Sequence, residues 1–341
     1  MTKLKVMSVC SGVGGLDKPF IEDSDTFEVI GFSEVDKHAT AVLKYHHPRI
    51  INYGDITKIR TEELPNFDIL VGGTPCQSFS IAGKRKGFEG SSGLFEHFIR
   101  ILKDKRPMYF IHENVLGMLS STSGWDFARV QMEMAEAGYD FRWEVLNAKE
   151  FGVPQNRERV FTLGTLRGSS RSEILHSSRK GRLDSKIEQD EQQREEKFIA
   201  TRYLGRNGKL TSEISPTIQA SDHPHIKTNK VLAWSSSGRS WGRDERVTSE
   251  HFHTLNTGDG CRTQSAATYV TSDNQTIRKL TPLECERLMS WSDNYTKYGY
   301  YGGTNTKEVT DSQRYKMCGN GVVSDCVYPL AEKIKEMHYG R

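Results

Sequence analysis

The chain has 341 residues, and its 47 lysines and arginines against 44 aspartates and glutamates give a formal net charge of +3 at pH 7. This weak basic excess is compatible with a nucleic-acid partner but does not identify one. No apolar run approaches the roughly 18 residues of a membrane-spanning helix, and no cysteines form a Cys-x-x-Cys pair, which argues against a membrane protein and a zinc site.

The first half of the chain alternates strand-like and helix-like segments. Strands are predicted at residues 4–9, 27–35, 67–73, 108–115, 143–147 and 159–166, and helices at 39–47, 93–105 and 125–139. Alternation of this kind is typical of a parallel sheet with helices on both faces. The sequence therefore predicts a doubly wound α/β fold.

The second half has a different composition. Residues 167–198 are charged and poor in apolar side chains, which predicts a linker or a solvated helix. Residues from about 200 to 278 are rich in Ser, Thr, Gly and His without a helical period, which predicts a small, loop-rich second domain. Helices return at 281–291, where Thr281 and Glu284 form a capping box, and at 322–337 after "CGNG".

A glycine turn, "SVCSGVGGL", follows the first predicted strand. Glycines here permit positive φ and a close approach of the backbone to a ligand. Glu34 at the end of the next strand could accept hydrogen bonds from a ribose, and Asp55 in "NYGDI" could accept from an adenine amino group. The three features together indicate an adenosine-containing ligand, and these residues leave both NAD and S-adenosylmethionine open.

Chemically active residues stand at the ends of the later strands. Cys76 follows Pro75 after strand 67–73, and Glu113 lies in "HENV" at the end of strand 108–115. Arg157 and Arg159 are two residues apart and are expected to share one face of an extended segment with Gln155. Each of these alone is usually structural, but strand ends at one edge of a sheet converge on one site.

Several motifs resemble those of the cytosine-5 DNA methyltransferases. They are, in chain order, "SVCSGVGG", "SEVD", "GDI", "GGTPCQSFSIAGKRKGFEG", "HENV", "QNRERV", "RKLTPLECERLMSW" and "RYKMCGNGVV". The resemblance covers residues 4–166 and 278–335. It implies a Rossmann-like class I methyltransferase domain, S-adenosylmethionine as cofactor with S-adenosylhomocysteine as product, and a cytosine in double-stranded DNA as substrate.

The resemblance also implies roles for the residues at the strand ends. Cys76 would add to carbon 6 of the cytosine, so that carbon 5 can attack the methyl group. Glu113, with its pKa raised in a dry pocket, would protonate ring nitrogen 3. Arg159 would hold the ring carbonyl oxygen, Arg157 would steady the thiolate side, and Gln77 follows the nucleophile in the catalytic motif. The target base has to leave the stacked duplex for this chemistry.

Further positions carry over by the same resemblance. The cofactor would contact Cys10, Gly12, Gly14, Gly15, Glu34, Val35, Asp55, Ile56, Pro75, Leu94, Asn320 and Val322. The DNA would contact Ser78, Ser80, Lys84, Arg85, Lys86, Gln155, Thr254, Leu255 and Arg262. Cys10 and Val35 stand where the family usually has aromatic residues beside the adenine, so the adenine contacts are expected to differ.

The resemblance divides the chain by function. Residues 1–166 and 310–341 would form the catalytic, cofactor-binding domain, and residues 167–309 would form the target-recognition domain with a charged linker at about 167–198. We expect a monomer, because one chain carries both parts, and we expect no bound metal. We also expect a cytoplasmic location, because targeting signals are lacking and free thiols suit a reducing compartment. A partner restriction endonuclease and a phage-borne protective role both stay open.

Three other functions compete with this prediction. An RNA cytosine-5 methyltransferase acting on tRNA would share the motifs, although the long 167–278 segment favours duplex DNA. A non-catalytic DNA-binding protein would not need Cys76, Glu113 and Arg159 together. A nicotinamide oxidoreductase would not need the Pro-Cys-Gln motif.

Overall fold

The computed structural model describes residues 2–74, 93–169, 280–302 and 305–340, together with the backbone of five short strands between residues 200 and 279. The chain divides into two compact units. The first unit comprises Met1–Leu146, Glu158–Leu183 and Cys326–Arg341, and the second comprises Asn147–Arg157 and Asp184–Asp325. These bounds describe compactness, whereas the predicted division at residues 166 and 310 is one of function and stays a prediction.

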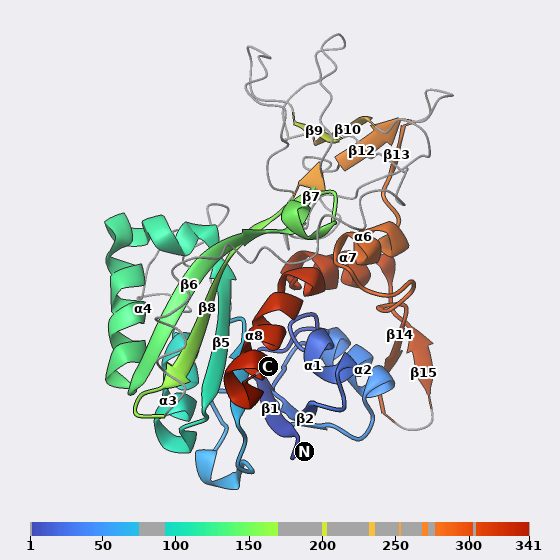
Figure 1. The fold of residues 1–341 in the computed structure, drawn as a ribbon. Coiled ribbons are helices and arrows are strands. Elements are labelled where there is room, and N and C mark those ends of the chain that lie inside the picture. The colour runs from blue at the N-terminus through green and yellow to red at the C-terminus, as the bar shows by residue number, and fades with distance from the viewer. Residues whose placement is uncertain are drawn as a thin grey trace. The chain divides into compact units, whose positions relative to one another are not determined.

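The first unit contains a seven-stranded sheet (Figure 1). Its order is β3 (Ile51–Asn52), β2 (Phe27–Phe32), β1 (Leu4–Val9), β4 (Ile69–Gly72), β5 (Tyr109–Val115), β8 (Glu158–Leu166) and β6 (Tyr139–Asn147). Strand order reverses between β1 and β4, and this switch point is where open α/β sheets bind their ligands. The predicted doubly wound α/β fold is confirmed.

One strand departs from the expected parallel arrangement. β8 lies antiparallel to β5, with Glu113 opposite Phe161 and Val115 opposite Arg159. The segment between β6 and β8 carries only a short 3-10 turn, η4 (Ala148–Phe151), and the two-residue strand β7 (Gln155–Asn156). A parallel return needs a crossover of a dozen or more residues, so this short connection reverses the chain direction.

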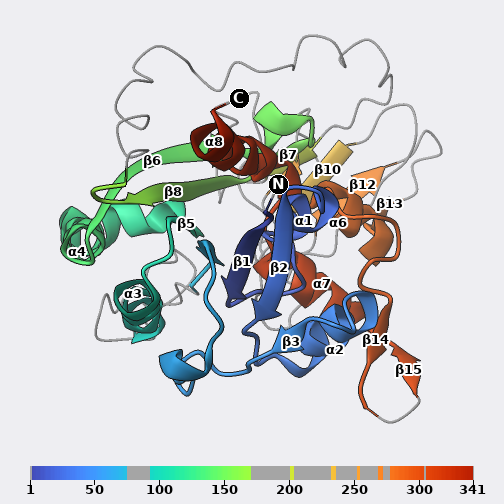
Figure 2. The ribbon, with the colours of Figure 1, turned by 60° about the horizontal axis from the view of Figure 1, so that its bottom comes forward.

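Helices of the first unit cover both faces of its sheet (Figure 2). Side chains of α3 (Gly93–Lys105) and α4 (Trp125–Glu136) share an apolar core with Met7, Leu70 and Phe110. On the opposite face, α8 (Tyr328–Tyr339) brings His338 within 6.1 Å of the Tyr109 ring, measured between centroids. Tyr109 and Phe110 are adjacent in β5, so their side chains point to opposite faces.

The remaining helical segments in the described part of this unit are short. They are α1 (Lys18–Glu22), α2 (Lys37–His46), and the 3-10 segments η1 (Thr61–Glu63) and η3 (Leu116–Gly124). α2 begins where the Asp36 side chain accepts from the backbone amides of His38 and Ala39, the usual N-cap arrangement. The predicted helix 125–139 is too long, because Gly138 adopts a φ of +92° and β6 starts directly after it.

The second unit has small sheets and two helices in its described part. β13 (Ile277–Lys279), β12 (Thr268–Thr271), β10 (Leu232–Ser235) and β9 (Ala200–Arg202) form one sheet. β11 (Phe252–His253) pairs with β7, and β14 (Tyr298–Tyr300) pairs with β15 (Thr306–Glu308). The helices are α6 (Pro282–Leu288) and α7 (Asp311–Asn320), and the 3-10 turn η6 (Ser324–Cys326) follows them at the boundary of the units.

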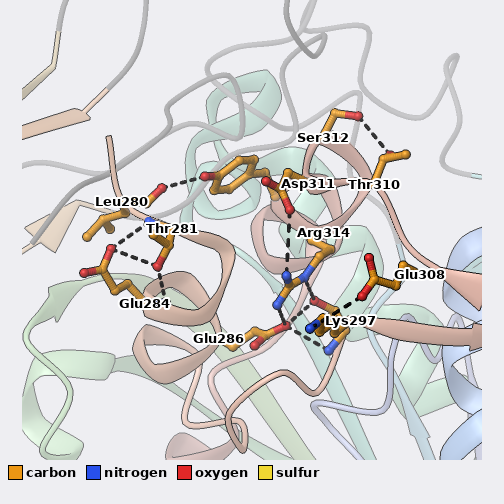
Figure 3. Close-up of polar contacts among 12 residues, drawn as sticks. Leu280, Thr281, Glu284, Glu286, Lys297, Glu308, Thr310, Asp311, Ser312 and Arg314 are labelled. Carbon is orange, nitrogen blue, oxygen red and sulfur yellow. Dashed lines mark hydrogen bonds and ion pairs between the residues drawn. The ribbon is translucent and has the colours of Figure 1, made fainter. Parts of the chain in front are cut away.

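A buried polar cluster joins α6 to α7 (Figure 3). Thr281 and Glu284 form the predicted capping box at the start of α6. Deeper in the unit, the Arg314 guanidinium lies 2.9 Å from Glu286 Oε1, which also accepts from the Thr296 amide at 2.8 Å. Because Glu286 is completely buried, this ion pair and the hydrogen bonds to Oε1 offset the cost of burying the charge, while Oε2 has no hydrogen-bond partner among the described residues.

Among the helices that the structure describes, none combines the length and the apolar character needed to cross a bilayer.

Candidate active site

The glycine turn after β1 lies on the side of the site where the cofactor is predicted. Cys10, Gly12 and Gly14 all have positive φ, at +51°, +55° and +88°. A Cβ added at Gly12 would meet no atom within 4 Å, so glycine is required there for its backbone conformation, and the space beside it is open. An open backbone at the switch point leaves room for a ligand to approach.

Glu34 holds this turn against the end of β2. Its Oε2 accepts from the Gly12 amide at 2.7 Å, and its Oε1 accepts from the amides of Val35 and Asp36 at 2.9 and 2.7 Å. Burial raises the pKa of Glu34, while these amides oppose the rise. Asn52 Oδ1 accepts from the Glu34 amide at 3.0 Å and fixes the backbone that carries the carboxylate.

Asp55 and Cys10 complete this side. Asp55 is a partly exposed carboxylate, whose pKa is lowered by hydrogen bonds from the Thr57 hydroxyl and amide. Burial, with smaller contributions from the charges of Glu34 and Asp55, raises the pKa of Cys10 to about 12, which places the thiol near both carboxylates. Cys10 is therefore a neutral thiol, as expected of a small, largely buried residue.

The other predicted cofactor positions differ in exposure. Val35 is 69% exposed beside Glu34, and Ile56 is 3% exposed. Leu94 in α3 is partly buried against the main core. The exposed apolar side chain of Val35, next to the Glu34 carboxylate, fits a flat ring stacked over it. The glycine turn, the Glu34 carboxylate and Val35 thus fit an adenosine-containing group.

Glu113 and Arg159 meet at the end of β5 and the start of β8. Arg159 Nε lies 3.1 Å from Glu113 Oε1, and each side chain is nearly nine-tenths buried. A Cβ added at Gly73 would lie 2.9 Å from Glu113 Oε2, so the lack of a side chain at Gly73 lets the carboxylate sit against the end of β4. Asn114 Oδ1 accepts from the Val115 amide at 2.7 Å and braces the end of β5.

Gln155 and Arg157 do not lie on one continuous strand with Arg159. The Arg157 amide donates to the Gln155 carbonyl at 3.0 Å, a tight turn that separates β7 from β8. The predicted shared face is therefore wrong, because alternation of side chains requires an unbroken extended segment. Gln155 is fully buried, and its Nε2 donates to the Leu288 carbonyl at 3.1 Å.

Arg157 holds the turn that follows α7 within the second unit. Its Nη2 donates to the carbonyls of Gly319 and Gly321, at 3.1 and 2.5 Å, and the residue is 2% exposed. A Cβ added at Gly321 would lie 2.5 Å from the Trp291 ring, so this turn needs glycine. Between and beside these carbonyls lie the predicted cofactor residues, exposed Asn320 and buried Val322.

Several predicted residues lie outside the described part of the chain. They are Pro75, Cys76, Gln77, Ser78, Ser80, Lys84, Arg85, Lys86, Thr254, Leu255 and Arg262. Within the described ranges, no group of three His, Cys, Asp or Glu side chains is arranged to hold a metal ion.

Sequence reasoning missed three residues that support the site. Asn52 supports the Glu34 backbone, His112 contacts Thr74, and the buried Asp17 donates its amide to the Gly14 carbonyl of the glycine turn. Asn52 could have been found, because it stands three residues before Asp55 in the motif "NYGDI". A histidine in an otherwise apolar strand and an aspartate after a glycine turn carry no such signal, because both residues are usually exposed.

A doubly wound sheet with a glycine turn after β1 and an acidic residue after β2 is typical of nucleoside-binding α/β proteins. The C-5 cytosine-specific DNA methylase family matches residues 4–336. The chain belongs to this family.

Relatives in sequence differ in how much of their own length this chain matches. The type II methyltransferase M.FnuDI of Fusobacterium nucleatum is 30% identical over 352 residues, which cover 98% of this chain and 94% of that protein. The orphan methyltransferase M.Rho11sI of Bacillus phage rho11s is 34% identical over 274 residues, which cover 74% of this chain and 54% of that protein. For that relative and three others, the match spans only 38% to 54% of the relative's length.

Solved structures share the fold. The methyltransferase Dnmt2 of S. pombe superposes with a TM-score of 0.57 at 15% identity, over 98% of this chain and 99% of that chain. The Entamoeba histolytica methyltransferase EhMeth gives a TM-score of 0.57 at 14% identity, over the same shares. At these identities the likeness supports the methyltransferase-type fold alone.

Proposed function

We propose that the chain is a DNA (cytosine-5-)-methyltransferase that modifies a flipped cytosine in a specific double-stranded DNA sequence. The observation that carries this proposal is the pair of Glu113 and Arg159, which lies against Gly73, two residues before the Pro-Cys-Gln motif. A carboxyl group and a guanidinium beside a cysteine are the groups that cytosine activation requires. Membership of the C-5 cytosine-specific family supports the same chemistry.

The cofactor in this proposal is S-adenosylmethionine, which supplies the methyl group. Glu34 binds the ribose hydroxyls with the lone pairs that its three backbone amides leave available. Val35 covers one face of the adenine, and Asp55 accepts from the adenine amino group. Gly12, Gly14 and Gly15 allow close approach of the backbone, and Ile56, Pro75, Leu94, Asn320 and Val322 complete the pocket, with Cys10 as a small neutral neighbour.

The chemistry on the cytosine uses three side chains. The Cys76 thiolate forms a bond to carbon 6, while Glu113 gives its proton to ring nitrogen 3, so that the electron pair gained by the ring becomes available at carbon 5. After carbon 5 has taken the methyl group, a base removes the carbon 5 proton, ring nitrogen 3 returns its proton to Glu113, and the carbon–sulfur bond breaks. The thiolate returns to Cys76 and the aromatic ring is restored.

Arg159 has two partners in this mechanism. Its contact with Glu113 at 3.1 Å favours the ionised carboxylate, which cannot donate a proton. When the cytosine enters, the guanidinium transfers its hydrogen bond to the ring carbonyl oxygen, and Glu113 is left to take up and deliver the proton. Entry of the base thus switches the carboxyl group into its donor form.

The remaining parts of the proposal concern the DNA. The basic loop with Ser78, Ser80, Lys84, Arg85 and Lys86 contacts phosphates next to the flipped base, and Gln77 stands beside the nucleophile. Residues 167–309 form the target-recognition domain, in which Thr254, Leu255 and Arg262 contact the duplex. Gln155 affects DNA binding indirectly, because its side chain is buried and its amide donates to the Leu288 carbonyl instead of reaching the duplex.

The cellular setting belongs to the same proposal. The chain acts as a monomer in a bacterial or phage-infected cytoplasm and needs no metal. The names of its relatives include both type II and orphan methyltransferases, so either a cognate restriction endonuclease or a phage-borne protective role fits.

Parallel methyl-transfer assays test this function. The purified chain is incubated with S-adenosylmethionine carrying a tritiated methyl group, and with either duplex DNA or total tRNA. We expect label in DNA at carbon 5 of cytosine, and no label with Cys76→Ser. Label in tRNA alone would establish the RNA methyltransferase, and full activity of Cys76→Ser would exclude the covalent mechanism.

A further inference from the structure

His112 is an uncommon residue for its place in the fold. It lies in the middle of β5, is 1% exposed, and packs against two aromatic rings of α3. The imidazole centroid is 5.3 Å from that of Phe95 and 5.0 Å from that of Phe98. An apolar side chain would fill such a pocket without the cost of burying a polar ring.

The imidazole makes one polar contact that the structure defines. His112 Nε2 lies 2.9 Å from Thr74 Oγ1, and Nδ1 has no hydrogen-bond partner among the described residues. Burial lowers the pKa of His112 to about 3, so the ring is neutral at physiological pH. The neutral ring carries one hydrogen, so Nε2 either donates to the Thr74 hydroxyl or accepts from it, according to the tautomer, and the hydrogen bond exists in both cases.

Thr74 is the last residue of the chain before the Pro-Cys-Gln motif, two residues after the end of β4. It is 4% exposed, follows Gly73, and directly precedes Pro75 and Cys76 in the sequence. In the β4–β5 pairing, His112 lies opposite Gly72. The next β5 residue, Glu113, lies against Gly73. Two adjacent residues of β5 therefore contact two adjacent residues at the end of β4.

We propose that His112 is a positioning residue, which fixes Thr74 through its hydrogen bond and so sets the point from which the Pro75–Cys76 segment begins, in register with Glu113. The inference rests on the proposed methyltransferase function and adds a residue to it. The contact acts on the chemical step, because both the nucleophile and the proton donor depend on its geometry. It should change ribose and adenine binding little, because the residues proposed for those groups follow β1, β2 and β3, and only Pro75 among the proposed cofactor residues adjoins Thr74.

The test compares variants that remove the contact from either side. Thr74→Val keeps the shape and loses the hydroxyl, His112→Phe fits an aromatic pocket and loses the ring nitrogens, and Thr74→Ser keeps the hydroxyl. Tyr139→Phe is the matched control, because it removes another buried hydrogen bond of the same unit, from Tyr139 Oη to the Pro107 carbonyl at 2.7 Å, before the start of β5. Thermal unfolding establishes that each variant is folded at the assay temperature.

Single-turnover methyl transfer to duplex DNA and the dissociation constant of S-adenosylmethionine are measured for each variant. We expect Thr74→Val and His112→Phe each to slow transfer about three- to tenfold, the effect of one lost hydrogen bond. The double variant should be no slower than the slower single variant. Thr74→Ser and Tyr139→Phe should keep the parent rate, and the dissociation constant should stay within about twofold throughout.

Three results would overturn the inference. They are an unchanged rate in Thr74→Val, independent effects that multiply in the double variant, or a Tyr139→Phe rate as slow as that of Thr74→Val. If His112→Phe does not fold, the comparison of Thr74→Val with Thr74→Ser decides alone. A parent chain that transfers no methyl group to DNA would contradict the proposed function itself, whereas normal transfer in the parent with unaffected variants contradicts only the role of His112.

Discussion

Asp17 makes the stability of the first unit depend on pH. It follows the glycine turn, is completely buried, and neither carboxyl oxygen has a hydrogen-bond partner among the described residues. The nearby Ser8 hydroxyl donates to Ser11 Oγ at 2.9 Å. Burial raises the pKa of Asp17 from 3.8 to about 7, and the approach of Ser8 only opposes this rise.

The sign and size of the effect follow from this difference. Well below its unfolded pKa of 3.8 the carboxyl is protonated in both the folded and the unfolded chain, so it imposes no ionisation cost. As the pH rises from about 4 to about 7, the unfolded chain releases the proton first, and the free energy of unfolding falls. The pKa difference between 3.8 and about 7 corresponds to roughly 4 kcal/mol at high pH, about 2–3 kcal/mol of which appears between pH 5 and pH 8.

Denaturant unfolding at pH 5, 6, 7 and 8 measures this contribution directly. Asp17→Asn keeps the shape of the side chain and removes its ionisation, so the variant should become more stable than the parent by a margin that grows with pH. Asp25→Asn, at an exposed position in the same unit, should keep the pH dependence of the parent. Parallel curves for the parent and Asp17→Asn would refute the reasoning.

Three further predictions concern charged groups. Arg157→Met should cost about 3 kcal/mol of unfolding free energy, because the carbonyls of Gly319 and Gly321 lose their donor, and unchanged thermal unfolding would count against this clamp. Arg314→Met should cost about 3–5 kcal/mol, because it leaves the Glu286 charge buried, and adding Glu286→Met should recover most of that loss in the same measurement. Glu113→Gln should slow single-turnover methyl transfer at least 100-fold at constant cofactor affinity, the scale of a lost general acid, and a near-normal rate would remove Glu113 from the mechanism.

Much of the first unit was predictable because its strands are short, apolar and regularly spaced. The predicted strand 4–9 and helix 93–105 coincide with β1 and α3. The antiparallel direction of β8 was not readable, because it follows from the length of a connection and not from the residues of the strand.

Two helices, α7 and α1, were not predicted, and α7 shows where hydrophobic periodicity fails as a signal. α7 reads "DSQRYKMCGN" and contains few apolar residues, so no helical pattern is visible. Its stability depends on tertiary contacts, among them the buried Arg314 that reaches Glu286. α1 was missed for a simpler reason, since five residues are too few for a pattern.

The site was predictable as a set of residue types, but their contacts were not. Spacing alone suggested that Arg157 and Arg159 act together, whereas a turn at Arg157 sends the two guanidinium groups to different partners. The contact of His112 with Thr74 joins residues 38 positions apart, and only the strand register brings them together.

Adduct formation on 5-fluorocytosine-containing duplex DNA tests the central claim most directly. Fluorine at carbon 5 cannot leave as a proton does, so the final elimination is blocked and the carbon–sulfur bond persists. The account predicts a denaturant-resistant protein–DNA complex that forms only with S-adenosylmethionine present, and mass spectrometry should place the attachment on the peptide containing Cys76. Efficient methylation of ordinary DNA without any such complex, or attachment at another residue, would contradict it.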